Sequence, residues 1–85
     1  IERGSRDGAR LGPTVVWNAP AAAKVMAEEV FGPVATIVPV ADLDAALAEV
    51  NASRFGLQAA IFTRDLDAAW RFARQAYCGG VLIND

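Results

Sequence analysis

Residues 34–63 determine the fold class and read VATIVPVADLDAALAEVNASRFGLQAAIFT. The first seven, residues 34–40, are nearly all apolar and mostly β-branched, which is typical of a strand buried on both faces of a parallel sheet. Pro39 has no N–H to donate and is tolerated only near the end of such a strand. Residues 58–63 are again mainly apolar and predict a second strand.

A helix is expected between these two strands, from Asp42 to about Asn51. The Asp42 side chain can accept hydrogen bonds from the free N–H groups of the first helical turn. Apolar residues then recur at helical spacing and form one stripe: Leu43, Ala46, Leu47 and Val50. A helix that joins two neighbouring strands in this way predicts a right-handed crossover between parallel strands.

A second crossover is predicted after residue 63. Asp65 is the expected cap of the next helix, and Gly79 and Gly80 are expected to end it as left-handed caps. Its buried face is predicted to contain Leu66, Ala69, Trp70, Ala73 and Tyr77. With a last strand at 81–83, the sequence predicts an α/β fold with an incomplete parallel-sheet βαβαβ layer over residues 34–85.

The preceding part of the chain is less regular. Residues 1–13 are polar and rich in glycine, so a loop or a weak sheet edge is expected there. Residues 14–17 predict a short strand, residues 21–26 a short helical turn and residues 28–33 a loop. We therefore treat residues 1–85 as one partial domain, whose exposed strand edges need further strands to cover them.

The composition excludes several classes of partner and site. Of 85 residues, 54% are hydrophobic and 21% are charged, and the formal net charge is −2. The basic residues are scattered, so we expect neither nucleic acid nor a membrane as a partner. Because the chain has no histidine, imidazole metal sites and Ser-His-Asp or Cys-His sets are excluded within it, and no metal site is predicted.

Cysteine usage and hydropathy favour a cytoplasmic protein. The single cysteine, Cys78, cannot form an intrachain disulfide, which favours a reducing compartment. No apolar run approaches the ~18 residues that a membrane-spanning helix needs. The first residue is Ile1 rather than methionine, so we expect the chain either to begin inside a longer reading frame or to be a processed or trimmed piece.

The chemical prediction depends on residues 27–34, which read AEEVFGPV. This stretch resembles the Glu-Glu-(Ile/Val/Thr)-Phe-Gly-Pro signature of the aldehyde dehydrogenase superfamily. Three further stretches resemble motifs of the same family in the same order: PTVV at 13–16, FGLQAAIFTRDL at 55–66 and GVLIN at 80–84. The resemblance covers nearly the whole chain and implies that it belongs to the carboxyl-proximal part of the family's catalytic domain.

The resemblance implies the oxidation of an aldehyde to a carboxylate with NAD or NADP as cofactor. In that reaction a cysteine attacks the aldehyde, a hydride passes to the nicotinamide, and water hydrolyses the thioester. By position in the motif, Glu29 accepts hydrogen bonds from the hydroxyls of the nicotinamide ribose, and Phe31 lies beside the nicotinamide. Leu57 is a further candidate for the same region, and Glu28 is expected to be structural.

Both cofactor candidates also have a simpler interpretation. Without the resemblance, Glu29 is a solvated loop carboxylate or a member of a surface ion pair, because most glutamates are exposed. Phe31 is then a core residue or a loop anchor.

Cys78 is not expected to be the catalytic cysteine. It is predicted to lie at a helix C-terminus, where partial negative charge disfavours a thiolate. The resemblance assigns the nucleophile, the general base, the oxyanion-hole asparagine and the glycine-rich cofactor loop to segments outside residues 1–85. We therefore predict no catalytic residue in this chain, which by itself should not oxidise aldehydes.

The expected partners are an aldehyde substrate of the full-length enzyme and further copies in a homo-oligomer. Residues 79–85, which read GGVLIND, are similar to the branch of the family that acts on small or phosphorylated aldehydes. The alternative is a non-catalytic remnant, or an oligomerisation or interaction module whose sheet edges pair with a neighbour. A start codon near Ile1 would favour the remnant, whereas a continuous upstream frame that encodes a cysteine would favour the enzyme.

Overall fold

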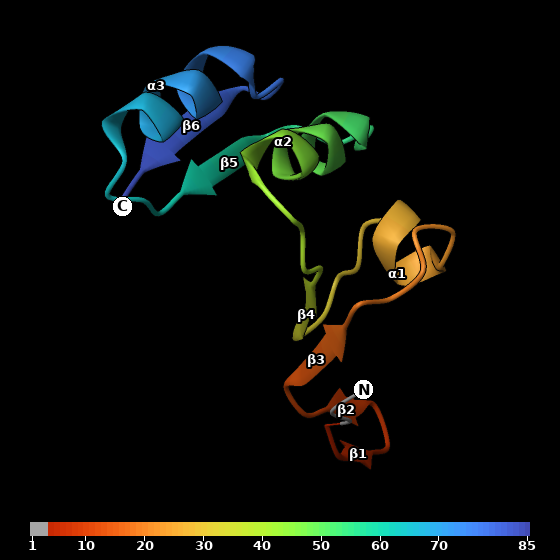
Figure 1. The fold of residues 1–85 in the computed structure, drawn as a ribbon. Coiled ribbons are helices and arrows are strands. Elements are labelled where there is room, and N and C mark those ends of the chain that lie inside the picture. The colour runs from red at the N-terminus through yellow and green to blue at the C-terminus, as the bar shows by residue number, and fades with distance from the viewer. Residues whose placement is uncertain (1–3) are drawn as a thin grey trace. The chain divides into compact units, whose positions relative to one another are not determined.

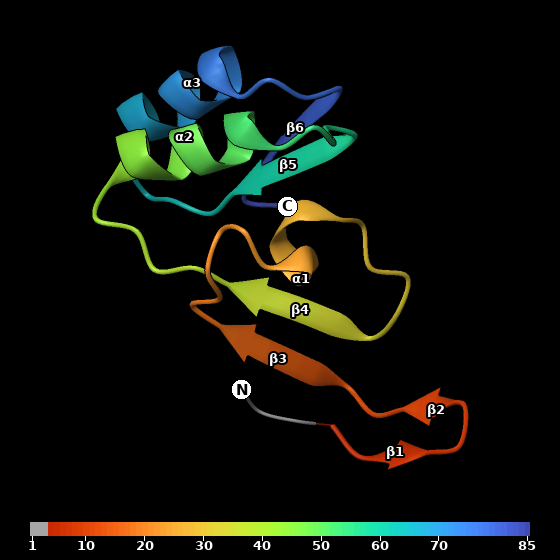
Figure 2. The same cartoon turned by 90° about the vertical axis from the view of Figure 1, so that its right-hand side faces the viewer.

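The computed structural model describes residues 4–85 and divides into two compact units. One unit extends to Pro39, and the other extends from Val40 to Asp85. Figure 1 and Figure 2 show the helices and strands of each unit. The units are described separately below.

The first unit begins with a short hairpin within the region predicted as a loop or weak edge. Strands β1 (Arg6–Asp7) and β2 (Arg10–Leu11) are antiparallel, and each has two residues. Gly8 in the turn has a φ of 57°, a left-handed conformation that glycine adopts without steric cost. The turn of this hairpin is at residues 8–9, between the two strands.

A parallel strand pair follows the hairpin in the same unit. Strand β3 (Thr14–Trp17) pairs with β4 (Val34–Ile37), and the short helix α1 (Lys24–Ala27) lies between them in sequence. The predicted strand over 34–40 is too long, because β4 ends at Ile37, shortly before the proline that cannot donate a hydrogen bond. The βαβαβ layer predicted from the sequence did not include β3 as the partner of β4.

The second unit contains helix α2 (Leu43–Ala52), strand β5 (Gln58–Ile61), helix α3 (Leu66–Gln75) and strand β6 (Gly80–Ile83). β5 and β6 are parallel, and both helices lie side by side on one face of this strand pair (Figure 2). The predicted α/β class with parallel strands is therefore confirmed. The single βαβαβ layer predicted over residues 34–85 is divided, because β4 pairs with β3 while β5 and β6 form a separate two-stranded sheet. No helix of residues 4–85 is long and apolar enough to cross a membrane.

Both predicted aspartate caps are present in the second unit. An Asp42 side-chain oxygen accepts a 2.9 Å hydrogen bond from Ala45 N at the start of α2. One Asp65 oxygen accepts hydrogen bonds from the N–H groups of Asp67 and Ala68 at the start of α3. Each cap provides a partner for N–H groups that the first helical turn leaves free, which explains where both helices begin.

The predicted buried face of α3 is wrong in part. Ala69 is buried as expected, but the main buried side chain is Phe72, which is 4% exposed. Leu66, Trp70 and Tyr77 are 69%, 54% and 88% exposed. Apolar residues occur on two sides of this helix, and the strand pair covers only the side that carries Ala69 and Phe72.

Gly79 and Gly80 do not cap α3 in a left-handed conformation. Ala76 ends the helix in an extended conformation, and Gly80 is the first residue of β6. Gly79 is required for another reason: its N–H donates to Gly56 O at 2.8 Å, and a Cβ would lie 3.0 Å from Leu57 O. The glycine allows two backbone segments to approach closely.

Two asparagine side chains connect segments that are distant in sequence. Asn51 Nδ2 donates to Gln75 O at 2.9 Å, and its Oδ1 accepts from Tyr77 N at 2.7 Å, so it joins the ends of α2 and α3. Asn84 Oδ1 accepts from Thr63 N at 2.8 Å, and its Nδ2 donates to Thr63 O at 3.0 Å. The Asn84 amide therefore extends the β5–β6 hydrogen bonding past the end of the strands.

Asn84→Ala is expected to destabilise the second unit by about 1–3 kcal/mol, because two backbone groups lose their amide partner. Asn84 also has a φ of 57°, which alanine adopts at a cost. Asn84→Gly is the control, since it removes the amide but tolerates this φ, and a smaller loss is expected. Urea unfolding measures both variants, and an alanine variant as stable as the wild type would contradict this role.

The buried core of the described residues is small. Only Leu47, Ala69 and Phe72 are buried apolar residues among residues 4–85, and all three belong to the second unit. Many large apolar side chains are exposed: Leu11, Val15, Trp17, Val30, Phe31, Ile37, Val40, Phe55, Leu57, Phe62, Leu66, Trp70, Tyr77 and Ile83. Exposed apolar surface on this scale is typical of surfaces that contact other protein segments or ligands.

Candidate functional site

The loop between α1 and β4 carries both cofactor candidates and is held at its two ends. At its start, Glu28 N donates to Lys24 O at 2.8 Å. At its end, Pro33 O accepts from Thr14 N at 2.8 Å, which attaches the loop to the start of β3. The backbone that leads into the loop and the backbone that leaves it are therefore both fixed by hydrogen bonds.

Glu29 and Phe31 are both exposed on this loop. Phe31 is 94% exposed, so within the described residues it is neither a core residue nor a packed loop anchor. The Glu29 carboxylate makes no ion pair in residues 4–85, which leaves its oxygens free to accept hydrogen bonds. A tight turn follows these residues, in which Val34 N donates to Gly32 O at 2.8 Å.

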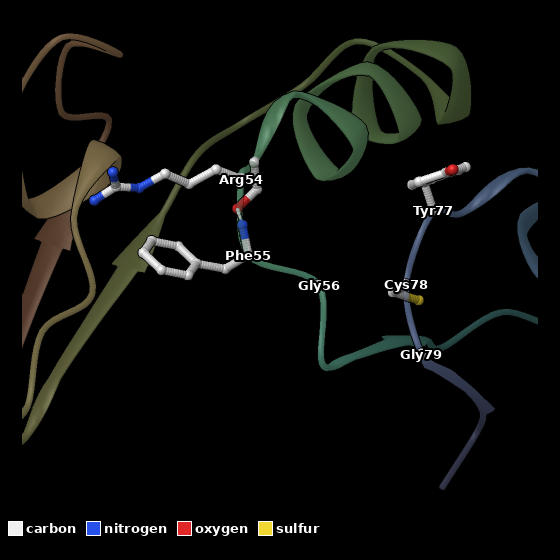
Figure 3. A pocket seen from close by; sticks show the side chains of 7 residues that line it. Arg54, Phe55, Gly56, Tyr77, Cys78 and Gly79 are labelled. Carbon is white, nitrogen blue, oxygen red and sulfur yellow. Dashed lines mark hydrogen bonds between the residues drawn. The ribbon is translucent and has the colours of Figure 1, made fainter.

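A pocket of about 490 Å³ lies in the second unit, where the polypeptide enters β5 and β6. Its lining residues are Ser53, Arg54, Phe55, Gly56, Tyr77, Cys78 and Gly79 (Figure 3). The sequence analysis did not predict this pocket. The available signal was the parallel pairing itself, because the residues that precede two neighbouring parallel strands meet at one edge of the sheet.

The polar groups of this pocket do not converge on one point. The Arg54 guanidinium lies over the Phe55 ring, 4.9 Å from its centroid, and both side chains point away from the segment with Tyr77 and Cys78 (Figure 3). Ligand pockets usually combine apolar walls with a few polar groups that point at the same ligand. The geometry therefore favours the loop between α1 and β4, called the Glu29 loop below, over this pocket as the candidate functional site.

Cys78 lines the pocket but has no catalytic arrangement around it. Its Sγ donates to Gly80 O at 3.1 Å, and its side chain is half-buried. It lies between α3 and β6, beyond the helix end at which the sequence analysis placed it. A nucleophilic cysteine needs an adjacent base or a cation that stabilises its thiolate, and the chain has no histidine to act as that base.

Leu57 is 88% exposed and belongs to the second unit, whereas Glu29 and Phe31 belong to the first. Leu57 precedes β5, and its carbonyl oxygen accepts from Gly80 N at 3.1 Å. Its exposed side chain is free for contact with another group. Within residues 4–85, no three histidine, cysteine, aspartate or glutamate side chains lie together as ligands for a metal ion.

Comparisons with a family model and with a known protein both identify the aldehyde dehydrogenases. Residues 1–85 match the family model that is described as the aldehyde dehydrogenase family. The chain is 43% identical over 82 residues to 3-sulfolactaldehyde dehydrogenase from Priestia aryabhattai, a match that covers 96% of this chain and 17% of that protein. The chain therefore spans about a sixth of the length of this relative.

Solved structures of aldehyde dehydrogenases are also similar to this chain. Aldehyde dehydrogenase 21 from Physcomitrella patens, in complex with the reaction product succinate, matches with a TM-score of 0.90 and 40% identity. This match covers 95% of the chain and 17% of that structure. NADP-dependent glyceraldehyde-3-phosphate dehydrogenase from Bacillus halodurans C-125, complexed with NADP, matches with a TM-score of 0.90 and 39% identity, and covers 99% and 18% of the two chains.

Proposed function

This chain belongs to the aldehyde dehydrogenase family, and from that premise we propose that it is part of the catalytic domain of an enzyme that oxidises an aldehyde to a carboxylate with NAD or NADP. The proposal concerns a longer polypeptide, because the chain spans 17% of a 3-sulfolactaldehyde dehydrogenase. The family resemblance assigns the catalytic cysteine and the general base to segments outside residues 1–85. Residues 1–85 alone are therefore expected to lack activity.

The observation that supports this proposal best is the geometry of the Glu29 loop. The loop is fixed at both ends, and between these ends a carboxylate and a phenyl ring two residues apart are exposed. A ribose diol offers two O–H donors, which suit an ionised carboxylate in a charge-assisted pair. The residues present therefore fit the nicotinamide riboside part of a dinucleotide.

Each residue of the loop has a distinct role in the proposed site. When bound, NAD⁺ or NADP⁺ supplies the hydride acceptor of the reaction. Glu29 accepts hydrogen bonds from the ribose hydroxyls and so fixes the position of the sugar. Phe31 limits the orientations of the nicotinamide and excludes water beside it. This positioning matters because hydride transfer needs its reacting atoms close to van der Waals contact.

For the substrate, we propose a small aldehyde with an anionic group. The support comes from three of the similar proteins, whose names specify 3-sulfolactaldehyde, glyceraldehyde 3-phosphate and, as a product, succinate. These compounds carry a sulfonate, a phosphate and a second carboxylate. The phosphorylated members of the substrate class expected from the end of the last strand also carry an anionic group.

Steady-state kinetics of the full-length enzyme test both proposals. We expect aldehyde-dependent formation of NADH or NADPH, with kcat/KM about 10- to 100-fold higher for glyceraldehyde 3-phosphate than for glyceraldehyde, which differs only in lacking the phosphate. This ratio corresponds to one or two hydrogen bonds to a charged group. Equal values would contradict the substrate class alone, whereas no reduction of either cofactor with any aldehyde would contradict the enzymatic function.

A further inference from the structure

We propose that Thr14 is a positioning residue for the Glu29 loop, and that its side-chain hydroxyl keeps the Glu29 carboxylate where it meets the cofactor. The inference rests on the proposed function, because it names a further residue that the ribose contact needs. Thr14 itself lies outside the loop, at the start of β3. It acts through the backbone and has no contact of its own with the cofactor.

The backbone of Thr14 holds the carboxyl end of the loop. Thr14 N donates to Pro33 O at 2.8 Å, and Thr14 is the register partner of Val34. Thr14 and Val34 are the first residues of β3 and β4, so this hydrogen bond lies at the open end of the strand pair. Hydrogen bonds at the ends of elements open most easily. The loop end is therefore only as well fixed as Thr14 is.

The side chain of Thr14 restrains this strand end. Its half-buried Oγ1 donates to Gly12 O at 3.0 Å and accepts from Gly4 N at 3.2 Å. One hydroxyl therefore serves as donor and acceptor at once, which the methyl group of valine cannot do. Threonine also suits a strand because it is β-branched. The hydroxyl connects the start of β3 to two backbone segments that precede it.

These two backbone segments are themselves in close contact. Gly12 N donates to Ser5 O at 2.7 Å, and a Cβ on Gly4 would overlap the carbonyl oxygen of Gly12. Glycine at position 4 therefore allows the two strands of backbone to approach each other. Because the two segments support each other, the Thr14 hydroxyl is bonded to a fixed structure rather than to a free strand.

The position of Glu29 depends on this restraint because its side chain is exposed and has no packing to hold it. Glu29 lies four residues before Pro33, and the other fixed end of the loop is the Glu28 N–Lys24 O hydrogen bond at the short helix α1. If the Pro33 end opens, the loop has more conformations to lose when a ligand binds, and affinity falls. Loss of the Thr14 hydroxyl should therefore weaken cofactor binding.

Isothermal titration calorimetry of the full-length enzyme with NAD and NADP tests this effect. Thr14→Val keeps the shape of the side chain but removes the hydroxyl, and we expect Kd to rise about three- to tenfold, as for the loss of one hydrogen bond. Thr14→Ser restores the hydroxyl and should restore the wild-type Kd. Thr36→Val is the matched control, because it is the same replacement at an exposed position of β4. A serine variant as weak as the valine variant would overturn the proposal.

Hydrogen–deuterium exchange without cofactor measures the restraint itself. The amide of Val34, which donates to Gly32 O, should exchange faster in Thr14→Val and should be unchanged in Thr14→Ser. Gly4→Ala should also speed this exchange, because it displaces the backbone that binds the hydroxyl while Thr14 stays intact. Wild-type exchange in both Thr14→Val and Gly4→Ala would overturn the positioning role, whatever the cofactor affinities are.

A double-mutant cycle with Glu29→Gln separates this inference from the proposed function. If Thr14 acts through Glu29, Thr14→Val should have little further effect on Kd once Glu29 is replaced, because the effects of coupled residues are not additive. The same rise in Kd in both backgrounds would overturn the inference and leave the ribose contact intact. A wild-type Kd for Glu29→Gln alone would contradict the ribose contact itself, and with it the role of Thr14 in cofactor binding.

Discussion

Glu29→Gln in the full-length enzyme is expected to slow hydride transfer by about 10- to 100-fold, which corresponds to the weakening of one or two charge-assisted hydrogen bonds. The glutamine keeps the length of the side chain but removes the negative charge that accepts from both ribose hydroxyls. The fold should not change, because Glu29 is exposed and makes no ion pair in residues 4–85. Single-turnover kinetics measure the hydride step directly.

Glu28→Gln is the matched control for this variant. Glu28 is the neighbouring residue with the same side chain, and it is also exposed, but the family resemblance gives it no cofactor contact. We expect its single-turnover rate and cofactor affinity to equal those of the wild type. If Glu29→Gln also retained the wild-type rate and affinity, the proposed ribose contact would be wrong.

Phe72→Ala is expected to destabilise the second unit by about 3–5 kcal/mol, the usual loss for a buried phenylalanine. Phe72 is 4% exposed and is the largest of the three buried apolar side chains in the described residues. Small domains have a free energy of unfolding of about 5–15 kcal/mol, so this substitution removes a large part of it. The remaining core, Leu47 and Ala69, is too small to compensate.

Phe62→Ala is the control for the core variant, because Phe62 belongs to the same unit and is 75% exposed. It should change the free energy of unfolding by less than about 1 kcal/mol, as most exposed substitutions do. Urea unfolding followed by circular dichroism compares the two variants. Equal effects of Phe72→Ala and Phe62→Ala would show that the core is not centred on Phe72.

The sequence predicted most of the secondary structure because the determining signals are local. Asp42 and Asp65 mark the two helix starts, since an aspartate cap acts on N–H groups two or three residues away. The stripe that includes Leu47 identifies the buried face of α2, because apolar residues of that helix occur mainly on one side. In each case the residues that produce the signal lie within a few positions of one another in the sequence.

The features that were missed depend on distant partners. Phe72 was not predicted as buried because α3 has apolar residues on two sides, and only the packing against the strand pair selects between them. The hydrogen bonds of the Asn51 and Asn84 side chains were not predicted, because their backbone partners are between 21 and 26 residues away. Gly79 suggested a helix cap, whereas its role is a close approach to Leu57.

The candidate site was predicted in a different way. Glu29 and Phe31 were identified by the resemblance of residues 27–34 to a family motif, since periodicity and composition do not distinguish them from ordinary loop residues. The structure adds that both are exposed on a loop whose ends are fixed. Their contact with a cofactor stays a prediction.

A structure of the full-length enzyme with bound NAD or NADP decides whether Glu29 holds the cofactor. We predict that a Glu29 carboxylate oxygen lies about 2.5–3.0 Å from a hydroxyl oxygen of the nicotinamide ribose, within the usual range of such hydrogen bonds. A Glu29 side chain directed into solvent, with the ribose held by other residues, would contradict the proposed site.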